Sequence, residues 1–271
     1  MTRTLTRAIG LATSLLLLGG SISATALASE TTPFGIASFS IKTTETNAQG
    51  VNEPYEFTQA GGHPWALTNA IKFNSAQSPK DVIINLPAGL VANPQAVAHC
   101  ASYSEHCPTD SQVGVFEIHL GGEAELAILG AIYNMTPYSG QAAELGLEVP
   151  FFGRILLVGH LVSTSQGYSL AIVGRGLPQF NLSSLFSGGS GGAGLPSVHL
   201  TSLETTLWGV PADPVHNPQR GILCFSLTTG SELSCQGGGL ADGEESAPFL
   251  TLPGTCSGQP TATAWVDPWF E

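Results

Sequence analysis

Polar and aromatic side chains gather in one short stretch, LWGVPADPVHNPQRG at residues 207–221. Its Asp213, His216 and Arg220 are residue types that can form an acid–base set or an anion-binding set, and Asn217 lies among them. Asp213 and Asn217 each precede a proline. Such residues form turns, because the residue before proline is pushed out of the helical region. Two interpretations therefore stand, a chemical site or a turn of fixed shape, and we favour the turn.

In the structural interpretation, Arg220 pairs with Asp213, His216 bonds a backbone carbonyl, and Trp208 packs on the core from the end of a strand. The loop contains no nucleophile. The chain also lacks a G-x-S-x-G sequence, which marks the nucleophile turn of many hydrolases. We therefore name no catalytic residue, and a secreted hydrolase that uses this loop as its site is kept as an alternative.

Four tryptophans could serve as stacking platforms for sugar rings: Trp65, Trp208, Trp265 and Trp269. Trp65 belongs to the glycine-rich sequence AGGHPW, in which we expect His63 to lie in a tight turn rather than to bind a ligand. Packing in the core or at an interface is the ordinary role of any one tryptophan. A carbohydrate-binding module is therefore the first alternative to a purely structural protein.

The cysteines indicate disulfides rather than a metal site. Cys100 and Cys107 belong to HCASYSEHC, whose two His-Cys dipeptides also make up a legitimate zinc set, although zinc ligand pairs usually lie closer in sequence. Cys224 and Cys235 flank a predicted hairpin turn and could face each other across it. Cys256 is the odd one, and is either free or a competitor for Cys224 or Cys235. We expect no cofactor and no metal.

Carboxylates at short spacing could serve a glycosidase, which needs two of them flanking one bond. Glu123 and Glu125 share one strand face, and Glu144 and Glu148 also share a face. Nothing in the sequence directs either pair into a cleft, so we expect solvated strand faces. ADGEES at residues 241–246 lacks the spacing of a calcium loop and predicts a plain turn.

Composition narrows the class of partner. The formal net charge is −12, hydrophobic residues are 42 % and charged residues only 10 %. Such an acidic chain repels nucleic acid and anionic lipid. The hydrophobic content is too high for a disordered chain, so we expect a folded protein. The sequence does not identify its partner, and a cell-wall glycan and a surface protein are the two candidates.

The first 28 residues are typical of a secretory signal peptide. Arg3 and Arg7 form its positive start, Ile9–Leu18 forms a short apolar stretch, and Ala26-Leu27-Ala28 fits the cleavage rule. The apolar stretch is too short to cross a bilayer, which takes about 20 residues, and no later segment is long and apolar enough. We therefore predict a protein exported from the cytosol and an extracellular or cell-surface location.

Strand-like alternation predominates in the rest of the chain. We predict short strands at 34–45, 81–87, 113–120, 155–162, 168–174, 199–210, 221–229 and 261–266, and one short helical turn at 93–103. Many short strands separated by turns predict an all-β protein with antiparallel strands and long loops, a β-sandwich or jelly-roll-like fold over residues 29–271. A Gly/Ser-rich loop falls at 186–195, and a weak division is conceivable near residue 121.

Several blocks of the sequence resemble successive blocks of a family of secreted bacterial proteins, often longer and multi-modular, that are described only as hypothetical. The blocks are QAGGHPWALTNAIKFN (59–74), PKDVIINLPAGLVANPQAVAHC (79–100), CPTDSQVG (107–114), LWGVPADPVHNPQRG (207–221) and PFLTLPGTCSG (248–258). The resemblance implies export and a β-rich ectodomain, and it implies no particular activity. With the pattern above, it leads us to expect a non-enzymatic module of the cell surface, structural or adhesive.

Overall fold

The structure is a computed structural model. It describes residues 33–46, 52–74, 77–104, 106–122, 125–150, 152–180, 198–226, 234–239, 247–255 and 260–270, without the side chains of residues 46, 52–55 and 234–236. The predicted signal peptide, the Gly/Ser-rich loop, the turn at 241–246 and Cys256 lie outside these residues. Residues 32–271 form one compact unit, and the position near 121 falls inside a continuous strand.

Strands account for nearly all of the regular structure. They are β1 (Ile36–Thr46), β2 (Asn52–Glu56), β3 (Ala66–Phe73), β4 (Pro79–Asn85), β5 (Val91–Ala92), β6 (Gln112–Gly122), β7 (Leu126–Asn134), β8 (Ala143–Val149), β9 (Gly153–Thr164), β10 (Gly167–Gly174), β11 (Val198–Trp208), β12 (Leu223–Ser226), β13 (Ser234–Gln236), β14 (Leu250–Thr251) and β15 (Thr263–Pro268). Three short 3-10 helices join them: η1 (Pro94–Ala96), η2 (Thr109–Ser111) and η4 (Pro214–Gln219).

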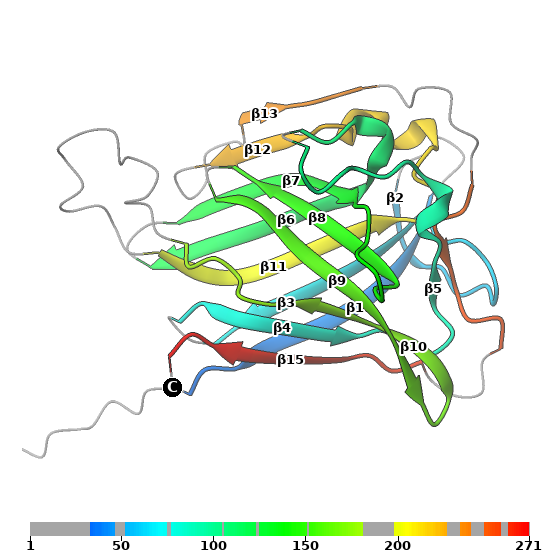
Figure 1. The fold of residues 1–271 in the computed structure, drawn as a ribbon, viewed down its shortest axis with the longest axis horizontal. Coiled ribbons are helices and arrows are strands. Elements are labelled where there is room, and N and C mark those ends of the chain that lie inside the picture. The colour runs from blue at the N-terminus through cyan, green and yellow to red at the C-terminus, as the bar shows by residue number, and fades with distance from the viewer. Residues whose placement is uncertain are drawn as a thin grey trace, which may run out of the picture. The chain divides into compact units, whose positions relative to one another are not determined.

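One large antiparallel sheet runs in the order β15-β4-β10-β9-β8-β7-β6-β11-β3-β1-β2 (Figure 1). Strand β7 has β6 on one side, and on its other side β8 pairs with its last residues and β12 with its first. Strand β13 pairs with β12, while β14 and β5 form a separate small sheet. The named strands that pair with each other are all antiparallel, as expected for an all-β fold.

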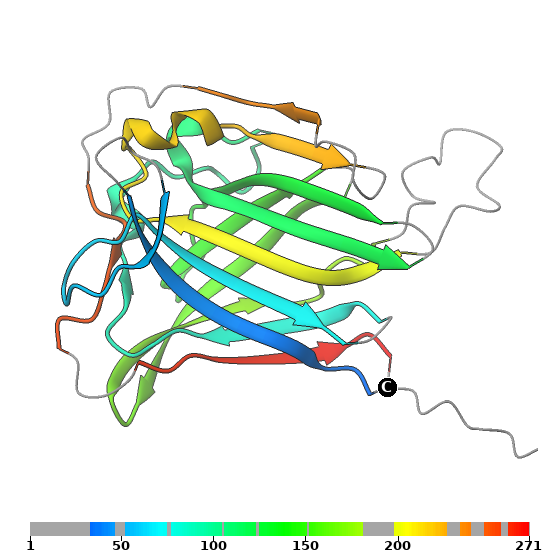
Figure 2. The ribbon, with the colours of Figure 1, turned by 180° about the vertical axis from the view of Figure 1, so that it is seen from behind.

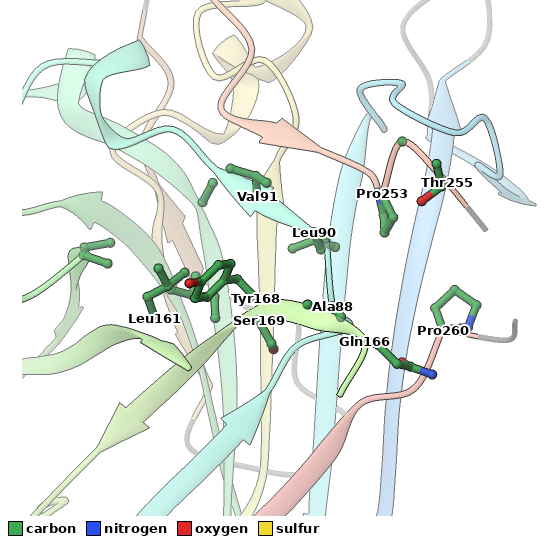
Figure 3. Close-up of a pocket in the computed structure, with 17 residues that line it drawn as sticks. Ala88, Leu90, Val91, Leu161, Gln166, Tyr168, Ser169, Pro253, Thr255 and Pro260 are labelled. Carbon is green, nitrogen blue, oxygen red and sulfur yellow. The ribbon is translucent and has the colours of Figure 1, made fainter. Parts of the chain in front are cut away.

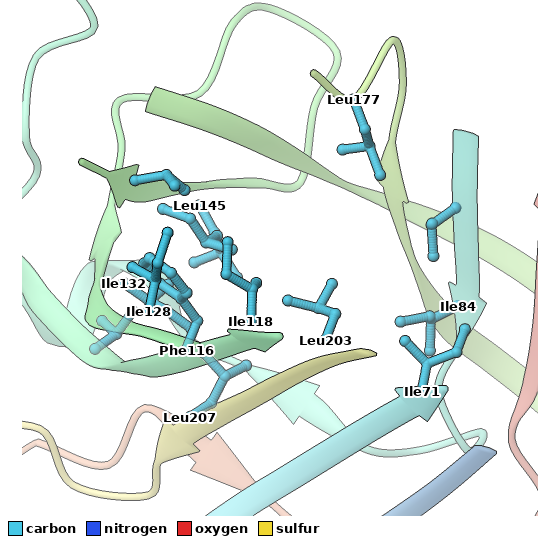
Figure 4. Close-up of a cluster of buried hydrophobic side chains, with 14 of the residues drawn as sticks. Ile71, Ile84, Phe116, Ile118, Ile128, Ile132, Leu145, Leu177, Leu203 and Leu207 are labelled. Carbon is cyan, nitrogen blue, oxygen red and sulfur yellow. The ribbon is translucent and has the colours of Figure 1, made fainter. Parts of the chain in front are cut away.

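The large sheet curls until its ends approach each other. Figures 1 and 2 both place β15 beside β1, and the two strands contact each other without forming a hydrogen-bonded ladder. Apolar side chains of β3, β4, β6, β7, β8 and β11 therefore point toward one another across the space that the sheet encloses (Figure 4). Each fully buried Leu, Ile or Phe contributes about 1.5–3 kcal/mol, so this cluster dominates the stability of the fold.

The predicted fold class is confirmed: the protein is all-β and antiparallel. The predicted strands at 113–120, 155–162 and 168–174 correspond to β6, β9 and β10. The predicted helical turn at 93–103 is shorter than expected, since only η1 forms there, with the Asn93 side chain accepting a hydrogen bond from the amide of Gln95 at 3.1 Å.

Strands β3, β7 and β8 were not predicted. Strand β7 is almost entirely buried, because its inner face meets the core while much of its outer face is covered by the loop that carries Cys100 and Cys107. A strand buried on both faces loses the alternation of polar and apolar residues on which the prediction depended. Within the described residues, no helix has the length and apolar character that a membrane crossing requires.

Candidate functional site

Three distant segments meet where β11 ends, and Gly209 lies at their junction. Its amide donates to the carbonyl of Trp65 at 2.9 Å, and its carbonyl accepts from the amides of Phe249 and Leu250 at 2.7 and 3.1 Å. A Cβ atom at position 209 would lie 1.6 Å from the carbonyl oxygen of Pro64, so only glycine fits. These contacts join three segments that are far apart in the sequence.

The loop after Gly209 takes its shape from local rules that the sequence shows. Asp213 caps η4, and its Oδ1 accepts a hydrogen bond from the amide of Val215 at 3.0 Å. Pro214 occupies the first turn, where its missing amide hydrogen costs nothing. Gln112 at the start of β6 then anchors the far end of the loop, since its amide group bonds both the carbonyl of Gln219 and the amide of Gly221. Sequence reasoning missed Gln112, and its place in the CPTDSQVG block was the only signal for it.

Arg220 is 2 % exposed and holds the loop from inside. Its Nη2 donates to the carbonyls of Pro211 and Asp213, its Nε donates to Oδ1 of Asn217 at 2.9 Å, and its guanidinium carbon lies 5.6 Å from the ring centre of Trp208. The expected ion pair with the Asp213 carboxylate is absent from the described ion pairs. The physical reason is that this carboxylate caps η4, which leaves the backbone carbonyl of Asp213 as the group that meets the guanidinium.

His216 is only 1 % exposed and packs between two indoles. Its ring stacks on Trp208 with centres 4.3 Å apart and planes 10° apart, and its centre lies 5.1 Å from that of Trp65. Neither ring nitrogen has a hydrogen-bond partner among the residues that the structure describes, so the expected bond to a backbone carbonyl is wrong. Burial lowers the pKa of His216 to about 4, with Arg220 lowering it further and Asp213 partly opposing the shift, so the ring is neutral at pH 7.

A pocket of about 330 Å³ opens beside His216, and we call it the Trp65 pocket. Its lining consists of Glu45, Phe57, His63, Pro64, Trp65, Val210, Asp213 and His216. His63 follows the turn that the hydrogen bond from the amide of Gly62 to the carbonyl of Gln59 closes, and its Nδ1 is 2.9 Å from the carbonyl of Leu250. Because a carbonyl only accepts, Nδ1 carries the proton in the neutral ring and Nε2 is an acceptor.

The structure brings the four polar loop residues Asp213, His216, Asn217 and Arg220 together, but it separates the four tryptophans. Trp65 and Trp208 both meet His216, and Trp208 is fully buried and offers no face to a ligand. Trp265 lies on β15 and is 51 % exposed, and Trp269 directly follows β15 and is 37 % exposed. The indole of Trp269 donates to the carbonyl of Leu177 at 3.1 Å, and Lys80 lies over its ring.

The cysteine sequence HCASYSEHC forms a disulfide, because Cys100 and Cys107 are bonded to each other. This bond confirms the favoured interpretation and leaves no thiolate there for zinc. Cys224 is also disulfide-bonded, and the backbone of Cys235 lies opposite it in the ladder of β12 and β13. The bridge between these two remains a prediction, since the side chain of Cys235 and all of Cys256 lie outside the described residues.

The carboxylate pair on β8 differs from the solvated face that we expected. Glu144 is 1 % exposed, its Oε1 has no partner in the described part of the chain, and burial raises its pKa. Glu148 forms an ion pair with Arg154 at 2.5 Å, from the directly opposite position on β9. Neither arrangement forms a pair of carboxylates facing one substrate bond, so we assign no glycosidase role to them.

A second carboxylate pair arises from the register of two strands, which the sequence could not reveal. Glu117 on β6 lies directly opposite Glu204 on β11, and His119 contacts Glu117 at 2.9 Å. They line a broad groove of about 790 Å³ on the sheet surface. Glu204 and His119 are exposed, so water screens the repulsion between the carboxylates and no buried acid–base pair results. Across the described residues, no group of three or more His, Cys, Asp or Glu could hold a metal ion.

Another pocket, of about 410 Å³, lies beside the hairpin of β9 and β10 (Figure 3). Leu161, Tyr168 and Val91 form an apolar rim around it, and Gln166 and Thr255 supply polar groups. Its lining, as far as the structure describes it, contains no Asp, Glu, His, Lys, Arg or Cys. The Trp65 pocket, in contrast, has both ionisable and aromatic side chains in its lining.

Comparisons of the chain with family models, with curated proteins and with solved structures found no match. The class of protein is therefore defined by the structure itself: an all-β antiparallel protein whose nearly closed sheet carries, at one end, a loop fixed from inside by a buried arginine.

Proposed function

We propose that the protein is an exported, non-enzymatic β-module that acts at the cell surface in architecture or adhesion. The main observation behind the proposal is that the polar side chains of the loop form hydrogen bonds within the loop itself. Arg220 binds backbone carbonyls and Asn217, and Asp213 caps η4. Side chains engaged in this way hold a shape, and a rigid loop at the end of a rigid sheet suits a module that binds or spaces other molecules.

Export is part of the same proposal. It rests on the signal-peptide pattern of residues 1–28 and on the resemblance to secreted bacterial proteins. The Cys100–Cys107 disulfide supports it, because disulfides form and persist in oxidising compartments and are rare in the cytosol.

A hydrolase at loop 207–221 is less well supported. A general base works best when its pKa is near the operating pH, whereas burial lowers the pKa of His216 to about 4. The described lining of the Trp65 pocket contains no Ser, Thr or Cys that could act as the nucleophile. A carbohydrate-binding module is the second candidate, because the half-exposed ring of Trp265 offers a stacking face on the sheet surface.

Expression of the full chain in a bacterial host, followed by sequencing of the exported protein, tests the first part. We expect an N-terminus at Ser29 and no free thiol at Cys100 or Cys107 in the exported form. The purified protein is then assayed for sedimentation with cell-wall preparations and for turnover of ester, glycoside and peptide substrates. Sedimentation without turnover supports the proposal, whereas turnover that His216→Phe abolishes refutes it. Loss of sedimentation in Trp265→Leu favours the carbohydrate-binding alternative.

A further inference from the structure

The Trp65 pocket has an excess of negative charge. Glu45 and Asp213 both line it, and none of its eight described lining residues is Lys or Arg. Arg220 is not in the lining, and its Nε and Nη2 donate to Asn217 and to backbone carbonyls of the loop. A ligand that brings a positive charge therefore meets two carboxylates with no competing cation on the pocket wall.

Aromatic groups form the rest of the wall. Phe57 and Trp65 are half-buried and both line the pocket. The face of an aromatic ring attracts a cation, with Trp the strongest, by about 0.5–2 kcal/mol depending on how far water is excluded. Carboxylates and aromatic rings together are the combination that holds ammonium and guanidinium groups, because one supplies charge and the other supplies a polarisable, apolar surface.

One residue of the pocket lining is a buried polar side chain that is neutral at pH 7. His216 is 99 % removed from solvent, lines the pocket, and has no described partner at either ring nitrogen. Both ring nitrogens are shielded from solvent, so a ligand in the pocket does not reach them, and the neutral ring adds no positive charge to the pocket wall.

We infer that the Trp65 pocket binds an organic cation, an ammonium or guanidinium group carried on an apolar stem. The inference rests on the proposed function in treating the protein as a module that binds rather than transforms its ligand. A volume of about 330 Å³ lies at the small end of ligand pockets and suits one amine or one basic side chain. An anionic ligand would be repelled by Glu45 and Asp213.

Two sources can supply this chemistry, a free amine or the Lys or Arg side chain of a protein partner. The net charge of −12 favours encounters with basic partners of either kind, because the field of an acidic protein concentrates cations at its surface. A neutral sugar would stack on Trp65 but would gain nothing from the charge of the carboxylates, so charge dependence separates the two ligand classes.

The test measures binding of four probes to the purified full protein by NMR titration: choline, Nα-acetyl-lysine methylamide, Nα-acetyl-norleucine methylamide and glucose. We expect the lysine derivative to bind at least tenfold more tightly than the uncharged norleucine derivative, and this advantage to shrink at high salt. Binding of choline as tight as that of the lysine derivative identifies a free amine as a sufficient ligand. Preference for the lysine derivative identifies a protein side chain.

Variants locate the binding. Asp213→Asn keeps a residue that can cap η4, and Glu45→Gln keeps the shape of its side chain, so both should fold. Each is expected to weaken binding of the lysine derivative by about five- to tenfold, and Trp65→Leu should weaken it similarly. Glu117→Gln removes a carboxylate outside the pocket and is the matched control, with unchanged binding.

Equal affinity for the lysine and norleucine derivatives, tighter binding of glucose than of either cation, or unchanged binding in Asp213→Asn and Glu45→Gln would each overturn the inference. Failure of all cations to bind, in a protein that is still exported and sediments with cell walls without turnover, would refute the cation site and leave the proposed function standing.

Discussion

Burial of His216 predicts an acid-sensitive fold. The pKa of its ring is about 4 in the folded protein, against 6.5 for an exposed histidine, because burial between two indoles disfavours the charged form. Between pH 6.5 and 4, His216 is mostly protonated in the unfolded chain and mostly neutral in the folded protein. The stability that depends on a neutral His216 is therefore fully present above pH 6.5, and it is lost as the pH falls toward 4.

The size of the effect follows from the two pKa values. Their difference, 6.5 − 4, is about 2.5, and each pKa unit corresponds to 1.36 kcal/mol, so the loss from this one group is roughly 3 kcal/mol. Near pH 5 the unfolded state holds almost one more proton on this residue than the folded state. The free energy of unfolding therefore changes there by about 1.2 kcal/mol per pH unit from His216 alone.

Urea unfolding followed by far-ultraviolet circular dichroism, between pH 7.5 and 4, measures this slope. His216→Phe keeps a flat ring against Trp208 and removes the titrating nitrogens, so the steep fall between pH 6.5 and 4 should become shallower by about 1.2 kcal/mol per pH unit. Any cost of the larger ring shifts the whole curve and leaves its slope unchanged. His160→Phe, at an exposed position on β9, should keep the wild-type slope. If His216→Phe retains the wild-type dependence on pH, the description of His216 as a buried neutral ring is wrong.

Four further perturbations test other parts of the structure. Arg220→Lys should lower the free energy of unfolding by about 2 kcal/mol or more, measured by urea denaturation, because a lysine cannot reproduce the fork of donors that satisfies the buried acceptors. Replacement of both Cys100 and Cys107 by serine removes their disulfide and should cost about 2–3 kcal/mol, seen as a lower midpoint in denaturant without reductant. Glu144→Gln should stabilise the protein at pH 7, because burial raises the pKa of Glu144 and disfavours its charged form. Below pH 4.5 the glutamate is protonated in both states, so the gain in the free energy of unfolding should disappear. An equal gain at both pH values would contradict this expectation. Gly209→Ala should cost at least about 3 kcal/mol in thermal or chemical unfolding, whereas Gly254→Ala, which has open space around its Cβ, should be nearly neutral.

The sequence predicted the turn within loop 207–221 correctly, but it did not predict all the contacts of the side chains in that loop. The prolines and the Asp213 cap indicated a fixed turn, and η4 forms there. The sequence also indicated that Arg220 holds the loop, but it assigned the wrong acceptor. A side chain can reach several groups within one loop, and which of them it meets depends on the path of a backbone that the local sequence does not specify.

The Trp65 pocket could not be predicted in the same way. Trp65 and His216 are far apart in the chain, and they meet only because β3 and β11 pair so that Trp208 lies opposite Ala66, directly after Trp65. Glu45 joins them because β1 pairs with β3 on its other side, with Thr44 opposite Ala66. Register between distant strands is set by the fit of whole core faces, which no single segment encodes.

The sequence by itself determined the all-β class, the Cys100–Cys107 bridge and the turn at Asp213, because alternation, close cysteine spacing and capping all act within a few neighbouring residues. The tertiary structure alone decided that His216 is buried without a described partner and that Glu144 is removed from water. Burial depends on what packs over a side chain, and here the covering segments come from distant parts of the chain that only the curled sheet brings together.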